Sequence, residues 1–357
     1  MIIDKSYQLH NVGTNEYILK ISYIFQTKEG RFQNEKERMK GKLSFSIQNR
    51  HITFKFELER NITVITGDSG TGKTKLINMV RMYSELGKTS GITLRCSKPC
   101  IVLSGINWET VLENTHESIV FVEESTSFLS SKAFASAIQS TDNYYVLVTR
   151  EPLPQIPYSI DAIKQIIKNE RKPKISKIFN GISVKTISDF PYEEVIVEDS
   201  KAGYQFYYKA SEKKGVICQS ARGKSNLLSD LNNSKANRIL LIADAAALGS
   251  EIKELMKFKQ LSNKTIDFFL PESFEWLVLK SAIFNTNAKV KSVLSNPVNF
   301  IESKDYFSWE RFFTHLLVEE TKDNPKQLRY PKSKNTLPTG YLSDANMDSI
   351  LNAMKNK

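Results

Sequence analysis

The chain has 357 residues, of which 40% are hydrophobic and 25% charged, a composition typical of folded globular proteins rather than disordered chains. No run approaches the roughly 18 apolar residues of a membrane helix, Asp4 interrupts the N-terminus where a signal peptide would be apolar, and three cysteines are too few for a disulfide framework. We therefore expect a cytoplasmic protein with no membrane partner. The 50 basic and 39 acidic residues give a net charge of +11, which favours a polyanionic partner such as nucleic acid.

The first sixty residues carry the patterns of β-strands. Residues 16–25 are rich in Ile, Tyr and Phe, and residues 42–48 and 51–58 alternate hydrophobic with polar side chains. The charged stretch at residues 27–42 is expected to form a long exposed turn. Residues 1–60 are thus predicted to form an antiparallel β element that leads into the next domain.

From Asn61 onward, strand and helix patterns alternate, which predicts a mainly parallel α/β sheet over residues 61–185. The expected strands are residues 62–66, 100–103, 119–122 and 144–149, and the expected helices are residues 73–86, 107–114 and 132–139. The polar stretch at residues 169–177 contains Pro173 and is expected to be a connector or edge loop. Basic residues in this region either track phosphates or form a solvated linker: Lys164, Lys168, Arg171, Lys172, Lys174 and Lys177.

A glycine-rich segment lies between the first of these strands and the first helix, and it has the complete pattern G-x-x-x-x-G-K-[ST]. The segment comprises Gly67, Asp68, Ser69, Gly70, Thr71, Gly72, Lys73 and Thr74. Glycines let the backbone wrap closely around phosphates, whose charge the backbone N–H groups and the helix N-terminus favour. The segment resembles the Walker A loop of P-loop ATPases. The resemblance implies ATP binding, with Lys73 reaching the β- and γ-phosphates and Thr74 acting as a ligand of Mg²⁺.

Two acids follow another predicted buried strand, at Glu123 and Glu124. This strand resembles a Walker B strand with glutamate in place of aspartate. The resemblance implies that Glu123 lies beside Mg²⁺, commonly through water, and that Glu124 orients or deprotonates the attacking water. The alternative is a strand that ends in two solvated acids. In P-loop ATPases a strand such as residues 144–149 often lies beside the nucleotide, so Arg150 is either near the phosphates or an ordinary surface residue.

The alternation of strands and helices restarts after residue 186. Expected strands are residues 194–197, 216–218, 238–243 and 267–270, and expected helices are residues 200–210, 224–231, 248–258 and 273–281. Glu198 and Asp244 each follow an apolar strand. Because the carboxyl ends of parallel strands meet at one edge of a sheet, we expect these two acids to lie side by side and to bind a metal ion.

Residues 192–281 resemble a Toprim domain, the metal-dependent fold of topoisomerases, primases and OLD-family nucleases. Glu198 matches the glutamate after the first strand of that family, and Asp244 matches the first acid of its D-x-D motif. The chain departs from the family at Asp199, where glycine is usual, and at Ala246, which replaces the second aspartate. We therefore expect metal binding at Glu198 and Asp244 to be weak and nuclease activity to be low or absent, because Ala246 cannot ligate. The order of an ATPase followed by a Toprim-like domain resembles OLD-family proteins of prokaryotic defence and repair systems.

The C-terminal part is predicted from pattern alone. Residues 186–300 are expected to form the smaller Toprim-like α/β domain, in which Glu272 and Glu275 either approach the metal site or favour a helix dipole. Residues 301–357 are expected to form a helix followed by a loose polar tail with one short helix near residues 347–354.

The predicted function is ATP hydrolysis, with Mg²⁺ as cofactor, that controls a Toprim-like domain acting on or binding nucleic acid. One alternative is an ATP-dependent switch whose inactive second domain binds a protein partner or a second copy of the chain. A small-molecule kinase is a further alternative, since P-loops also serve phosphate transfer.

Overall fold

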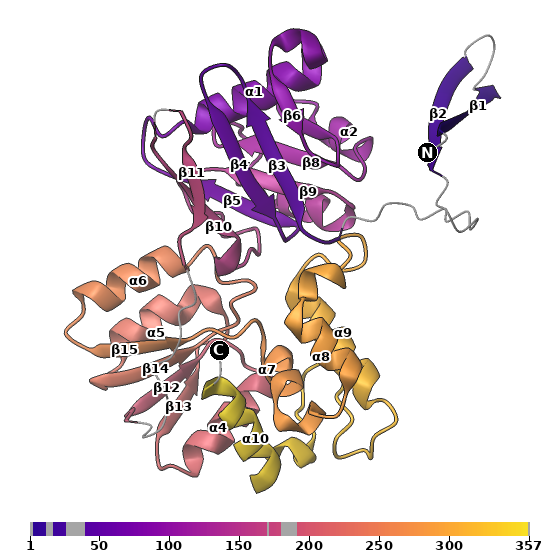
Figure 1. The fold of residues 1–357 in the computed structure, drawn as a ribbon. Helices are drawn as coiled ribbons and strands as arrows, with labels where there is room; N and C mark the ends of the chain where they lie inside the picture. Colours follow the sequence, from indigo (N-terminus) through magenta and orange to yellow (C-terminus); the bar gives the residue numbers. More distant parts are fainter. Residues whose placement is uncertain (1–2, 12–16, 26–39, 170, 180–190, 356–357) are drawn as a thin grey trace. The chain divides into compact units, whose positions relative to one another are not determined.

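The computed structural model describes residues 3–11, 17–25, 40–169, 171–179 and 191–355 (Figure 1). The chain divides into two compact units, Met1–Arg38 and Met39–Lys357. In the first unit the described residues form an antiparallel hairpin of β1 (Ile3–Asn11) and β2 (Tyr17–Phe25). The exposed turn expected at residues 27–42 lies outside the described residues up to residue 39, and so does the expected domain boundary at residues 185–186.

The second unit begins with a three-stranded antiparallel sheet of order β4-β3-β6. Its strands are β3 (Leu43–Gln48), β4 (Thr53–Leu58) and β6 (Thr93–Arg95). The alternating pattern of β3 and β4 buries one face of each strand, including Phe45 and Phe54, in a core shared with helix α1 (Lys73–Leu86). The expected antiparallel pairing within residues 42–58 is therefore observed, and β6 is an additional strand that the sequence pattern did not predict.

A six-stranded mixed sheet follows, in the order β11-β10-β5-β9-β8-β7. Its strands are β5 (Ile62–Thr66), β7 (Cys100–Val102), β8 (Ile119–Glu123), β9 (Tyr144–Val148), β10 (Ile163–Ile167) and β11 (Lys174–Lys177), and α2 (Trp108–Glu113) and α3 (Lys132–Ala137) lie in its connections. All neighbours pair in parallel except β10 and β11. The central strands β5 and β9 are buried on both faces, as expected of strands covered on two sides.

The stretch expected to be a loop at residues 169–177 contains a strand instead. Residues 174–177 form β11, which pairs antiparallel with β10 at the edge of the sheet. Pro173 directly precedes this strand. Because proline has no N–H to donate to a neighbouring strand, it is confined to positions such as this one at the start of an edge strand. Two of the basic residues in this region have structural positions: Lys164 is buried, and Lys177 forms an ion pair with Glu59 at 3.1 Å.

The second half of the unit contains a parallel four-stranded sheet of order β13-β12-β14-β15. Its strands are β12 (Glu194–Val197), β13 (Ile217–Ser220), β14 (Arg238–Ile242) and β15 (Thr265–Phe269). The helices are α4 (Ala202–Glu212), α5 (Leu227–Asn233), α6 (Ile252–Leu261), α7 (Phe274–Lys280), α8 (Ala288–Ser295), α9 (Trp309–Thr321) and α10 (Asp344–Lys355). We call residues 40–179 the first lobe and residues 191–355 the second lobe.

The C-terminal tail is packed, so the expectation of a loose tail after Thr321 is wrong. Tyr330, Leu337, Tyr341 and Ile350 are buried in the same core as the apolar side chains of β12 and β14. Helix α10 packs against α7. The sequence pattern concealed this because the buried residues are spaced widely among Lys, Pro and Asn.

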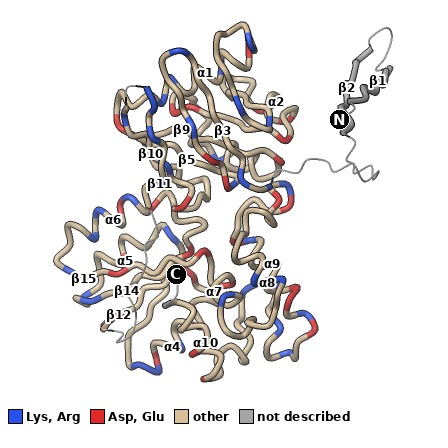
Figure 2. Tube along the Cα trace, in the orientation of Figure 1, with Lys and Arg blue, Asp and Glu red and all other residues tan. Residues whose placement is uncertain are grey.

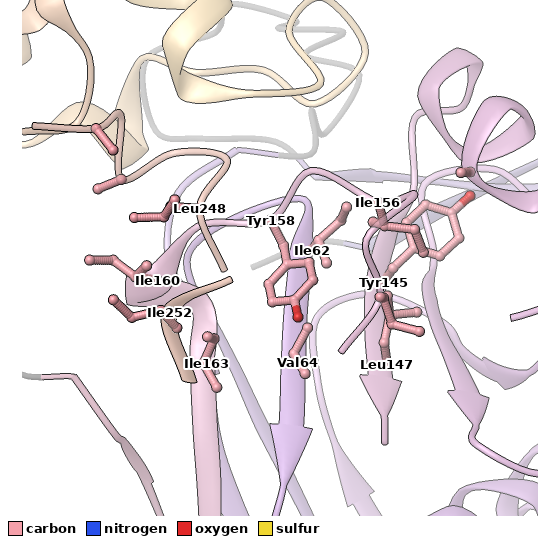
Figure 3. Packing of buried hydrophobic residues seen from close by; sticks show 14 of the residues in the cluster. Ile62, Val64, Tyr145, Leu147, Ile156, Tyr158, Ile160, Ile163, Leu248 and Ile252 are labelled. Carbon is pink, nitrogen blue, oxygen red and sulfur yellow. The ribbon is translucent and has the colours of Figure 1, made fainter. Parts of the chain in front are cut away.

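One hydrophobic core continues from the first lobe into the second. Tyr158 and Ile160 precede β10 in the first lobe, and Leu248 and Ile252 lie at the start of α6 in the second lobe (Figure 3). All four side chains are at most 4% exposed. The two lobes therefore share a buried apolar junction.

Candidate functional site

The glycine-rich segment forms a tight loop between the carboxyl end of β5 and the N-terminus of α1. Gly72 has φ +108°, and a Cβ atom there would lie 3.3 Å from the ring of Phe54. A Cβ atom at Gly67 would lie 3.0 Å from Thr71 Oγ1 and 3.2 Å from the carbonyl oxygen of Ile166. Both positions therefore require glycine for conformation or space.

Lys73 lies inside the loop rather than in solvent. Its side chain is buried, and Nζ donates hydrogen bonds to the carbonyl oxygens of Gly67 and, at 2.9 Å, Asp68. Burial lowers the pKa of Lys73, and the charge of Arg150 lowers it further, whereas the charges of Glu124 and Asp68 oppose this shift. The ammonium group is thus positioned within the loop, while Thr74 next to it is exposed to solvent.

The two predicted acids lie at the same sheet edge as the loop. β9 separates β8 from β5, and all three strands run parallel, so their carboxyl ends point the same way. The Arg150 backbone N–H donates to Glu124 Oε2 at 2.9 Å, and Arg150 Nε lies 3.4 Å from Glu124 Oε1. Glu123 Oε2 lies 3.8 Å from Nη2 of Arg81 on α1. Each glutamate is therefore paired with an arginine.

A cavity of about 560 Å³ adjoins the loop, a volume in the usual range for small-molecule sites. The first lobe contributes Gly67, Asp68 and Ser69 of the loop, together with Thr149 and Arg150 after β9. The second lobe contributes Gly249, Ser250 and Lys253. No sequence pattern pointed to the second-lobe residues, because they come close to the loop only through the packing of the two lobes.

The second-lobe acids Glu198 and Asp244 follow the neighbouring parallel strands β12 and β14. Val197 is paired with Ile242, and the Glu198 N–H donates to the Ile242 carbonyl oxygen at 2.8 Å. The expected placement of both acids at one sheet edge is therefore observed. Burial raises the pKa of Glu198 to about 7, and the charges of Asp199 and Glu310 add to this shift. Burial also raises the pKa of Asp244 well above its usual value.

We call Glu198, Asp244, Glu275 and Glu310 the acidic cluster, because the charges of the other three raise the pKa of Asp244. Lys334, from the packed C-terminal tail, lies among these acids. Lys334 Nζ is 2.8 Å from Glu310 Oε1 and 3.4 Å from Glu275 Oε1. Burial lowers the pKa of Lys334, but the charges of Glu275, Glu310 and Asp244 raise it by more. Among the described residues no group of three His, Cys, Asp or Glu side chains is arranged to hold a metal ion. Sequence reasoning missed Glu310 and Lys334, which lie far along the chain and in no recognisable motif.

Asp199, the acid next to Glu198, caps a helix. The carboxylate of Asp199 accepts hydrogen bonds from the backbone N–H groups of Ser200, Lys201, Gly203 and Tyr204 at 2.7–3.3 Å, at the start of α4. This capping explains an aspartate where the Toprim pattern has glycine.

Glu272 and Glu275 are close in sequence but have different partners. Glu272 pairs with Arg60 of the first lobe, whereas Glu275 accepts a hydrogen bond from the Tyr330 hydroxyl at 2.8 Å and belongs to the acidic cluster. Only Glu275 therefore meets the expectation of an acid near Asp244.

Comparison with known protein families finds no family that matches the chain, and comparison with curated proteins finds no similar sequence. Within the described ranges, no helix combines the length and the apolar character needed to cross a membrane.

Proposed function

We propose that this protein binds and hydrolyses ATP at the glycine-rich loop, and that the nucleotide state controls a Toprim-like second lobe. The observation that carries the proposal is the position of Lys73, whose buried ammonium group lies inside the loop at the sheet edge that also carries Glu124. The carbonyl oxygens of Gly67 and Asp68 hold the ammonium group where phosphate oxygens would replace them. A lysine in this position acts on the β- and γ-phosphates of P-loop proteins.

The acids at the sheet edge support hydrolysis rather than binding alone. Glu124 lies beside the loop and is held by the backbone N–H of Arg150, which orients its carboxylate toward the strand ends. There it would accept a proton from the attacking water. Mg²⁺ in nucleotide sites is bound through one or two carboxylates together with phosphates and water. Thr74 and Glu123 would supply the protein ligands, after Glu123 leaves its long contact with Arg81.

The second lobe is proposed to bind nucleic acid without robust cleavage. The parallel pair β12 and β14, each followed by an acid, supports the Toprim-like assignment. Three features argue against an active metal centre: Ala246 cannot ligate, Asp199 caps a helix, and the ammonium of Lys334 already neutralises part of the acidic cluster. The net charge of +11 favours contact with a polyanion, and Lys and Arg residues lie on many elements of both lobes, interspersed with Asp and Glu (Figure 2).

The test combines an ATPase assay, with and without DNA or RNA, with a nuclease assay in Mg²⁺ and Mn²⁺. We expect Mg²⁺-dependent ATP turnover, nucleic-acid binding that weakens steeply with salt, and little cleavage. Absence of ATP turnover would contradict the ATPase proposal, and robust cleavage would contradict an inactive second lobe. If ATP is hydrolysed but no nucleic acid binds at low salt, the alternative with a protein partner is favoured.

A further inference from the structure

The segment that links β14 to α6 forms one wall of the cavity beside the glycine-rich loop. Ser250 of this segment and Lys253 at the start of α6 line the cavity together with Asp68 and Ser69 of the loop. The segment is fixed to the first lobe at Gly249, whose N–H donates to the Tyr158 carbonyl oxygen at 2.8 Å. The second lobe is therefore a structural part of the cavity beside the loop.

The contact at Gly249 leaves no room for movement toward the first lobe. A Cβ atom at this position would lie 2.2 Å from the ring of Tyr158. The adjacent Leu248 and Ile252 are buried in the core that both lobes share. The backbone at Gly249 is thus held against the first lobe, next to Ser250.

A hydrogen bond connects the wall of the cavity with one acid of the proposed hydrolytic site. Thr149 and Arg150 line the cavity from the end of β9, and the N–H of Arg150 donates to the carboxylate of Glu124. The terminal phosphate of a nucleotide bound at the loop would face this end, because Glu124 is the residue proposed to act on the attacking water. An anionic group is therefore expected between the loop and the second-lobe wall.

Lys253 is suited to meet this anion. It is exposed at the start of α6, and in the described part of the chain no carboxylate lies within ion-pair distance of its ammonium group. Arg150, the other cation of the cavity wall, is paired with Glu124. The charge of Lys253 is thus available for a ligand, and a charge-assisted hydrogen bond to phosphate is among the stronger polar contacts.

We propose that Lys253 of the second lobe contacts the terminal phosphate of the bound triphosphate, so that the nucleotide site is built from both lobes. This inference rests on the proposed ATP-binding function. A cation supplied from another domain to the terminal phosphate stabilises the charge that spreads over it during hydrolysis. Loss of that phosphate removes the contact, which would release the second lobe from the nucleotide.

The same segment connects the cavity with the acidic cluster of the second lobe. It begins at Asp244 and reaches Ser250, whose Oγ lies 2.9 Å from Lys224 Nζ. Lys224 also donates to the Ala247 carbonyl oxygen at 3.2 Å, and its charge acts on Glu198. A change at Ser250 or Lys253 on phosphate loss thus has a short physical route to Glu198 and Asp244.

The experiment measures binding of ADP and of a non-hydrolysable ATP analogue, with Mg²⁺, to the full chain and its variants. For Lys253→Ala we expect about tenfold weaker binding of the analogue, with ADP affinity unchanged. Lys253→Arg should retain most of the affinity. Lys257→Ala is the matched control. Lys257 lies one turn later on α6, its ammonium group is 3.9 Å from Glu254, and it is not among the described residues that line the cavity.

Equal loss for both nucleotides, or no difference between Lys253→Ala and Lys257→Ala, would overturn the inference while leaving the ATPase proposal intact. If the unmodified chain binds neither nucleotide, the proposed function fails and the inference fails with it. Thermal unfolding of each variant verifies that the fold is retained. We expect it to be retained, because Lys253 and Lys257 are both exposed on α6.

Discussion

Arg60 and Glu272 join the two lobes through two parallel hydrogen bonds of 2.6 and 2.8 Å between guanidinium and carboxylate. Both side chains are about nine-tenths buried. The guanidinium also lies 3.7 Å from the ring centroid of Trp309 on α9. Arg60 lies two residues before β5, which leads to the glycine-rich loop, and Glu272 lies two residues before α7, which carries Glu275 of the acidic cluster. The contact therefore fixes the relative position of the two candidate sites.

Loss of one partner of this pair should be costly. Glu272→Ala leaves the buried Arg60 charge with only the longer 3.7 Å contact to Asp161, so we expect the free energy of unfolding to fall by about 3 kcal/mol, measured by urea denaturation. The exposed pair Lys257–Glu254 provides the control, because Glu254→Ala should change stability by less than about 1 kcal/mol. Similar effects of the two substitutions would show that the buried pair does not hold the lobes together.

Glu124→Gln should separate binding from hydrolysis. The amide keeps the shape of the side chain but cannot accept the proton, so ATP should still bind while turnover falls by about 10²–10⁴-fold. Glu123→Gln should instead shift the Mg²⁺ concentration that supports turnover. A single-turnover assay at several Mg²⁺ concentrations distinguishes the two variants. Normal hydrolysis by Glu124→Gln would mean that another group orients the water.

The stability of the second lobe should depend on pH through Glu198. Burial raises the pKa of this carboxyl from 4.5 to about 7 in the folded state. Between these values the folded chain binds more protons than the unfolded chain, so the free energy of unfolding falls as pH rises through this window. Above pH 7 Glu198 is ionised in the folded state, and the full free-energy cost of burying its charge lowers the stability.

Glu198→Gln should remove this dependence. At pH 8 we expect the variant to be more stable than the unmodified chain by about 1–3 kcal/mol, and at pH 4 the two should be equal. Denaturation curves across pH 4–8 measure the difference, with the exposed Glu113→Gln as the control. A variant that is less stable at pH 8 would contradict the assignment of a destabilising charge at Glu198.

Lys334→Ala should convert the acidic cluster into a cation site. Without the ammonium, the carboxylates of Glu275 and Glu310 lose their counter-charge, so the variant should be less stable, and Mg²⁺ should restore part of the lost thermal stability. Lys332→Ala, an exposed neighbour, should show neither effect. If Mg²⁺ stabilises the unmodified chain as strongly as Lys334→Ala, the lysine does not take the place of a bound cation.

The sequence predicted the elements whose patterns are local. The β5 strand, the glycine-rich loop and α1 follow from a buried apolar run, three glycines and a helical period within about 25 residues. Glu198 and Asp244 could be paired because parallel strands place their carboxyl ends at one edge. The strands β1, β6, β10 and β11 were missed. Strands β6 and β11 have only three or four residues, which carry too little pattern to distinguish a strand from a loop.

Contacts between distant segments could not be predicted. Lys334 belongs to a stretch rich in Lys, Pro and Asn, where its composition indicates solvent exposure, yet the buried Tyr330 and Tyr341 hold that stretch against the second lobe. Ser250 and Lys253 approach the loop only because Leu248 and Ile252 share a core with Tyr158. Such long-range packing leaves no spacing in the sequence that could be recognised.

The most direct measurement is ATP turnover by the unmodified chain, by Lys73→Ala and by Lys75→Ala under identical conditions. Lys73 is buried in the loop, whereas Lys75 is exposed two residues later on the same helix. We expect Lys73→Ala to lose at least about 99% of the Mg²⁺-dependent turnover, by analogy with loss of a single charge-stabilising donor, and Lys75→Ala to retain it. Turnover by a folded Lys73→Ala protein at the level of Lys75→Ala would contradict the assignment of the loop as the site of ATP hydrolysis.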